Sequence, residues 1–142
     1  MAEKVLIVDD DKAFLQILAE RMQNRGMEVS TADSAAAALK MLEKETYDAV
    51  LLDLMMPEMG GIEALQVMRK KQPEIQVIFV TGHPSVSKGV EAMKLGAMDF
   101  IPKPVDMNEL TEKIHQAKAG RMILVEKRSQ EKIKKILTDK GW

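Results

Sequence analysis

Five polar side chains in this sequence each follow a short apolar run. Asp9 and Asp10 come after VLIV, and Asp53 comes after AVLL. Thr81 follows VIFV, and Lys103 follows FIP. Carboxylate oxygens are the ligands that Mg²⁺ prefers, and a hydroxyl and an ammonium can bind the oxygens of a phosphate group. If the apolar runs are neighbouring strands, these residue types indicate transfer of a phosphoryl group to or from a carboxylate.

The acidic residues of this set create an electrostatic problem if they meet. Two unit charges ~4 Å apart repel by roughly 4 kcal/mol at an effective dielectric constant near 20. A positive group must therefore compensate Asp9, Asp10 and Asp53. Lys103 and a divalent cation are the two candidates. We expect Mg²⁺, with Mn²⁺ as the alternative metal.

The elements that would position these residues alternate along the chain. Short runs rich in Val, Ile and Leu predict strands at 4–8, 27–31, 49–52, 76–80 and 98–101. Apolar residues at helical spacing predict helices at 12–25, 34–45, 62–71, 85–95 and 107–118. This alternation predicts a parallel sheet with right-handed crossovers, whose strand ends on one edge bring distant residues together.

Helix ends can also be located from the sequence. Asp11 and Asp106 precede helical patterns and suit N-terminal caps. Gly26, Gly96 and Gly120 follow helical patterns, and we expect each to be a C-terminal cap with a left-handed backbone.

Composition limits the class of protein. The chain has 142 residues, a formal net charge of −1 and no cysteine. We therefore expect one domain in a cytoplasmic protein, without a disulfide framework, signal peptide or membrane segment. Residues 121–142 carry seven Lys and Arg against three acids. We interpret this segment as a basic helical extension or linker of a domain at 1–120, too short and irregular for a coiled coil and without direct nucleic-acid binding.

Four ordered motifs resemble a known family. They are VLIVDDD at 5–11, DLMMPEMGGIE at 53–63, VTGHPSV at 80–86 and GAMDFIPKP at 96–104. With the capped last helix, they cover about residues 4–119 and resemble the receiver domain of two-component response regulators. The resemblance implies a doubly wound, flavodoxin-like (βα)₅ fold with a five-stranded parallel sheet in the order 2-1-3-4-5.

The resemblance also implies a function. Asp53 would accept a phosphoryl group from a sensor histidine kinase. The protein would be a phosphoacceptor rather than an enzyme, with Mg²⁺-dependent self-phosphorylation from small phosphodonors and self-dephosphorylation. Asp10, Asp53 and the backbone carbonyl of Met55 would bind Mg²⁺ directly, and Asp9 would hold a metal-bound water.

The same family pattern implies a conformational switch. Thr81 and Lys103 would contact the phosphoryl oxygens, and Phe100 would move inward together with Thr81. The peptide bond before Pro104 would be cis. The face formed by residues 84–118 would then change shape, and it could bind an output domain, a partner protein or a second copy.

Two departures from the family pattern change the expectations. The family motif M-P-x-M-D-G has Gly60 in place of its Asp here, which removes a turn or helix-capping side chain. Met55 and His83 occupy positions that tune attack of water on the phosphorylated aspartate. Because Met55 has no polar group to position a water, we predict a long-lived phosphorylated state unless His83 helps.

Several functions remain open on the sequence alone. The chain could be a single-domain phosphorelay intermediate, or the receiver part of a longer regulator, with the motifs at 81–86 and 96–104 resembling receivers of AAA+ activators. A carboxylate-nucleophile phosphatase is disfavoured because it usually carries an acid at the position of Met55. A phosphorylation-independent interaction module is disfavoured by the complete set of Asp, Thr and Lys.

Overall fold

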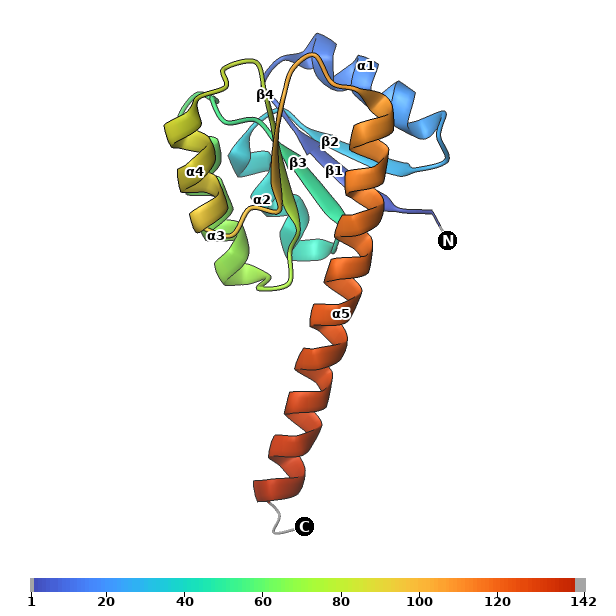
Figure 1. Cartoon of the computed structure of the whole chain (residues 1–142), viewed down its shortest axis with the longest axis vertical. Helices are drawn as coiled ribbons and strands as arrows, with labels where there is room; N and C mark the ends of the chain where they lie inside the picture. Colours follow the sequence, from blue (N-terminus) through green and yellow to red (C-terminus); the bar gives the residue numbers. More distant parts are fainter. Residues whose placement is uncertain (1, 140–142) are drawn as a thin grey trace.

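The protein is a three-layer α/β structure built on one parallel sheet (Figure 1). The computed structural model describes residues 2–139. Its five strands lie in the order β2-β1-β3-β4-β5. The elements are β1 (Lys4–Val8), α1 (Lys12–Gln23), β2 (Glu28–Ala32), α2 (Ala35–Lys44), β3 (Ala49–Leu52), α3 (Gly61–Lys71), β4 (Val77–Thr81), α4 (Val86–Lys94), β5 (Asp99–Pro102) and α5 (Met107–Asp139). The predicted fold and strand order are confirmed, and three strands begin one residue later than predicted.

The sheet is buried on both faces because its central strands consist of continuous apolar runs, such as Ala49–Leu52 of β3 and residues 77–80 of β4. All residues of β3 and β4 are buried. Alternate side chains point to opposite faces, so Leu6 packs with the cluster under α2, α3 and α4, whereas Ile7 packs with the cluster under α1 and α5. This is the pattern expected of a doubly wound parallel sheet.

Helix caps follow the predictions in most places. The Asp11 side chain accepts a hydrogen bond from the Phe14 N–H, and Asp106 accepts from the N–H groups of the first turn of α5. Gly26 and Gly96 have φ values of +86° and +100°, the left-handed backbone expected of a C-terminal cap.

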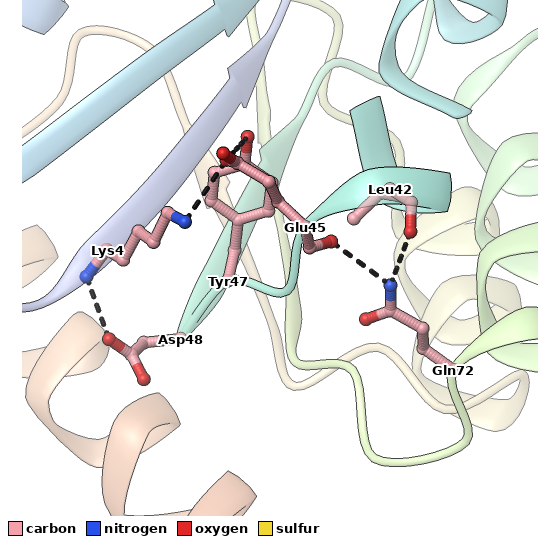
Figure 2. A network of polar contacts seen from close by, with 6 residues as sticks. All are labelled: Lys4, Leu42, Glu45, Tyr47, Asp48 and Gln72. Atoms are coloured by element: carbon pink, nitrogen blue, oxygen red, sulfur yellow. Dashed lines mark hydrogen bonds and ion pairs between the residues drawn. The ribbon is translucent and has the colours of Figure 1, made fainter. Parts of the chain in front are cut away.

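A polar network holds the edge of the sheet where β1 and β3 begin (Figure 2). The Lys4 N–H donates to Asp48 at 2.8 Å, and the Lys4 ammonium lies 3.1 Å from Glu45. The buried Tyr47 hydroxyl donates to Glu45, while the Gln72 amide donates to backbone carbonyls at the end of α2 and beyond it. The network therefore stabilises the edge where these strands begin, and it does not include the opposite edge, where they end.

The last helix corrects one prediction. α5 runs without interruption from Met107 to Asp139, so Gly120 lies inside the helix and is not a C-terminal cap. Helix-forming residues follow Gly120, and they offset the cost of one internal glycine, about 1 kcal/mol relative to alanine. The predicted division at 120/121 therefore falls within a helix and stays a prediction. Within residues 2–139, no helix is long and apolar enough to cross a membrane.

Two glycines provide a test of this description. A Cβ at Gly120 would meet only the Gln76 side chain, at 3.6 Å, so Gly120→Ala should raise the free energy of unfolding by about 0.5–1 kcal/mol. A Cβ at Gly61 would lie 2.3 Å from the Asp53 carbonyl oxygen, so Gly61→Ala should lower the free energy of unfolding by about 1–3 kcal/mol. Urea denaturation measures both. A destabilised Gly120→Ala variant would contradict a continuous α5.

Candidate functional site

The register of the sheet brings the predicted site residues to one edge. Val8 of β1 lies beside Leu52 of β3, and Leu52 lies beside Phe79 of β4. The Asp53 N–H donates to the Val8 carbonyl at 2.9 Å, and the Lys103 N–H donates to the Thr81 carbonyl at 2.8 Å. Ladder hydrogen bonds therefore continue past the strand ends and hold the loops that carry the polar side chains.

The three acidic residues meet at this edge. Asp9, Asp10 and Asp53 each place one carboxylate oxygen within 4.8 Å of the other two. Asp9 and Asp53 are only 2% and 5% exposed, whereas Asp10 is exposed to solvent. Asp53 Oδ1 is buried without a hydrogen-bond partner in the described part of the chain. Hard oxygen donors around an unpartnered oxygen fit Mg²⁺ or Mn²⁺.

Lys103 compensates part of this negative charge. Its Nζ lies 2.8 Å from Asp9 Oδ2, and the pair is largely buried. The same ammonium lies 3.8 Å from the centre of the Phe14 ring, within the range of a cation–π interaction. The helical pattern predicted at 12–25 places Phe14 in an apolar stripe, and Phe14 does pack on the α1 and α5 cluster. No spacing rule could have shown that its ring also faces Lys103.

Burial and charge together disfavour the ionised form of Asp53. Burial is the largest cause and, with the charge of Asp9, raises the pKa of Asp53 above its ordinary value. The Thr81 hydroxyl, the Lys103 charge and the Met55 N–H act in the opposite direction. The pocket is thus short of positive charge, which is the condition that favours binding of a cation.

The residues expected to switch lie behind the acidic pocket. Thr81 is fully buried, and its hydroxyl accepts a hydrogen bond from the His83 N–H at 3.1 Å. Phe100 is half-buried, with its ring centre 6.0 Å from that of Phe79. On its other side, a Cβ at Gly89 would approach the ring to 3.8 Å. The Phe100 ring therefore lies between the core and the surface.

The loop residues agree with two further expectations. The Lys103–Pro104 peptide bond is cis, as the family resemblance implied. Gly60 precedes α3 as its N-terminal cap and makes no side-chain capping bond, so the missing aspartate does remove a cap. Met55 is 58% exposed and His83 is exposed, so both side chains are open to water.

Comparison with known proteins identifies the family to which this fold and pocket belong. Residues 5–115 match the response regulator receiver domain family. The chain is 34% identical to a CheY-like receiver domain protein of Methanospirillum hungatei JF-1, with a TM-score of 0.80 over 86% of this chain and 98% of that one. A receiver domain of Clostridium thermocellum is 32% identical, with a TM-score of 0.82, over 87% and 99%. The chain therefore belongs to the response regulator receiver domain family.

Curated relatives are longer proteins. The chain is 33% identical over 107 residues to the photosynthetic apparatus regulatory protein RegA of Rhodobacter capsulatus, which covers 75% of this chain and 58% of RegA. It is 39% identical over 113 residues to the transcriptional regulatory protein GlrR of Escherichia coli K12, covering 80% of this chain and 26% of GlrR. The chain thus spans between a quarter and three fifths of these relatives.

The raised pKa of Asp53 leads to a stability prediction. Between the ordinary and the raised value the folded state binds more protons than the unfolded state, so stability falls as the pH rises through that window. Without divalent cations, Asp53→Asn should therefore increase the free energy of unfolding at pH 7 by about 1–2 kcal/mol, and this gain should vanish near pH 4.

The measurement is urea denaturation with a chelator at both pH values. Glu20→Gln removes an exposed carboxylate from α1 and serves as the control, with no change expected. An Asp53→Asn variant that is less stable than the parent protein at pH 7 would contradict the electrostatic description of the pocket.

Proposed function

We propose that the protein is a phosphorylation-activated switch that accepts a phosphoryl group on Asp53 from a sensor histidine kinase. The observation that carries this proposal is the buried Asp53 oxygen without a hydrogen-bond partner, set beside two acids and a lysine. That oxygen is free to act as a nucleophile, whereas a carboxylate with a purely structural role would be hydrogen-bonded.

The residues around Asp53 support defined roles in this transfer. Asp10, Asp53 and the Met55 carbonyl would hold Mg²⁺, with Asp9 acting through a water. When bound, the metal neutralises negative charge on the acidic cluster and on the incoming phosphoryl group. Asp53 forms the new oxygen–phosphorus bond as the nitrogen–phosphorus bond of the kinase phosphohistidine breaks, and the imidazole leaves with the electron pair. Lys103 contacts a phosphoryl oxygen, and this new contact replaces part of its ion pair with Asp9.

Thr81 would couple phosphorylation of Asp53 to a movement of Phe100. Its hydroxyl oxygen accepts a hydrogen bond from the His83 N–H, and its O–H can donate to a charged phosphoryl oxygen on Asp53. Rotation of Thr81 opens space next to the core, into which the half-buried Phe100 can move. Moving such an equilibrium from mostly inactive to mostly active needs about 3–5 kcal/mol of differential stabilisation, which a charge-assisted hydrogen bond and aromatic repacking can provide.

The face at residues 84–118 suits the role of output surface. An apolar groove of about 760 Å³ lies between α4 and β5, and Phe100 forms part of its wall. Val86, Val90 and Met93 expose their side chains there. We propose that this groove binds an output domain, a partner protein or a second copy once Phe100 has moved. We also propose a cytoplasmic location and a role in transcription regulation. The second is supported by the relative GlrR, which is a transcriptional regulatory protein.

Phosphorylation at Asp53 can be tested directly. Incubated with acetyl phosphate and Mg²⁺, or with a phosphorylated sensor kinase, the protein should gain the mass of one phosphoryl group, and Asp53→Asn should gain none. Asp33→Asn, which changes an exposed aspartate after β2, should behave like the parent protein. An unmodified parent protein, or modification of Asp53→Asn at the same rate, would contradict the proposal.

The lifetime of the phosphorylated state should depend on Met55. Met55→Asn places an amide that can orient water at the mouth of the pocket, so the half-life should shorten about threefold to tenfold, equivalent to about 1 kcal/mol of barrier. The exposed side chain makes an effect on folding small. Glu58→Gln, in the same loop, is the control. A half-life that lengthens in Met55→Asn would contradict this role.

A further inference from the structure

Phe14 of α1 contacts the predicted phosphorylation site as well as the core. Its half-buried ring packs on the apolar cluster under α1 and α5. The centre of the ring also lies 3.8 Å from Lys103 Nζ. A positive charge so close to the face of an aromatic ring is attracted by the negative electrostatic potential of that face. The mechanism proposed above uses Lys103 but assigns no role to this ring.

A carboxylate and an aromatic ring hold the Lys103 ammonium. Asp9 Oδ2 accepts a hydrogen bond from it at 2.8 Å, and this carboxylate is only 2% exposed. An ammonium has several N–H donors, of which this bond uses one. The ring attracts the charge as a whole rather than one N–H group. The two contacts therefore do not compete for the same donor, and both favour the same position of the ammonium.

The Lys103 side chain has a second place in which it could lie. Together with Phe14 and Ile17 it lines a groove of about 440 Å³ between α1 and the segment after β5. The side chain is 20% exposed, and the flexible stem of a lysine allows its strongly hydrated ammonium to extend toward water. Because the ring of Phe14 attracts the ammonium, it favours the position beside Asp9 over an extended position in the groove.

We propose that Phe14 is a positioning residue for phosphoryl transfer, because its ring holds the Lys103 ammonium at the acidic pocket before and after Asp53 is phosphorylated. This inference rests on the function proposed above. A hydrogen bond to a carboxylate fixes the direction of an N–H group, whereas attraction to a ring face allows the ammonium to rotate. The ammonium can therefore turn an N–H group from Asp9 to a phosphoryl oxygen on Asp53 while it stays over the ring.

Loss of the ring should have opposite effects on phosphoryl transfer and on cation binding. The Lys103 ammonium and a divalent cation both compensate the negative charge of Asp9 and Asp53. An ammonium that spends more time in the groove leaves more of this charge to the cation, which then binds more tightly. The phosphoryl oxygens lose a positive partner at the same time, so transfer to Asp53 becomes slower. A ring that only packed the core would change both properties in the unfavourable direction.

Phe14→Leu tests this role because it keeps an apolar side chain in the cluster and removes the ring. With acetyl phosphate and saturating Mg²⁺, this variant should gain the phosphoryl mass about threefold to tenfold more slowly than the parent protein. Calorimetric titration without phosphodonor should show Mg²⁺ binding about twofold to fivefold tighter than in the parent protein. Phe14→Tyr retains a ring face and should match the parent protein in both measurements. Ile17 lines the same groove and is 52% exposed, so Ile17→Ala is the matched control, with no change expected.

The two measurements together separate a positioning role from a packing role. Slower phosphorylation with weaker Mg²⁺ binding in Phe14→Leu would show that the ring only packs the core, and a rate equal to that of the parent protein would show that it has no part in transfer. Either result would overturn the inference. A parent protein that acetyl phosphate does not modify would contradict the proposed function itself, and with it the role of Phe14 in transfer. Urea denaturation checks that each variant remains folded.

The contact between Phe14 and Lys103 can be observed by NMR without a phosphodonor. Protons above the face of an aromatic ring resonate upfield because of the ring current. The ε-methylene signals of Lys103 should therefore lie upfield of those of the exposed Lys12 in the parent protein and in Phe14→Tyr, and this shift should be lost in Phe14→Leu. The shift should persist once the parent protein is phosphorylated. Lys103 signals at the position of the Lys12 signals in the parent protein would overturn the inference even if Asp53 accepts a phosphoryl group.

Discussion

The structure depends on the placement of a carboxylate with one unpartnered oxygen at the end of a completely buried strand. β3 contains only apolar residues, and Asp53 is the first residue beyond it. Its N–H is bonded to Val8, which places its side chain next to Asp9. The sheet stabilises this placement although the carboxylates repel each other, because the apolar strands on both sides cannot shift without exposing their side chains. In the proposed function, this unfavourable energy is the physical basis of cation binding and of phosphoryl transfer to Asp53.

Much of this architecture was predictable because it follows from local rules. The apolar run at residues 77–80 of β4 has no polar position at which a strand could face water, so its burial and parallel pairing could be predicted. The convergence of Asp9, Asp53 and Thr81 at one edge then follows from topology alone. The end of α5 was not predictable in the same way. Gly120 terminates a helix only when the next residues leave the helical path, and the residues after it favour a helix.

Details of the site that depend on side-chain direction could not be predicted. Helical spacing placed Phe14 in the apolar stripe of α1, but the position of its ring over the Lys103 ammonium depends on the turn after β5. The Arg128–Glu74 pair joins residues 54 positions apart and leaves no mark in the sequence pattern. The roles of Met55 and His83 stay predictions, because their exposed side chains do not define how a water would be oriented.

The measurement that tests the central claim most directly is a Mn²⁺ titration followed by NMR. If the strand ends form an acidic pocket around Asp53, the backbone amide signals of Asp10, Asp53 and Met55 should broaden first. Signals at the opposite edge, such as those of Lys4 and Gln72, should stay sharp, and Asp53→Asn should weaken the binding. Broadening that begins elsewhere, or binding unaffected by Asp53→Asn, would contradict the account.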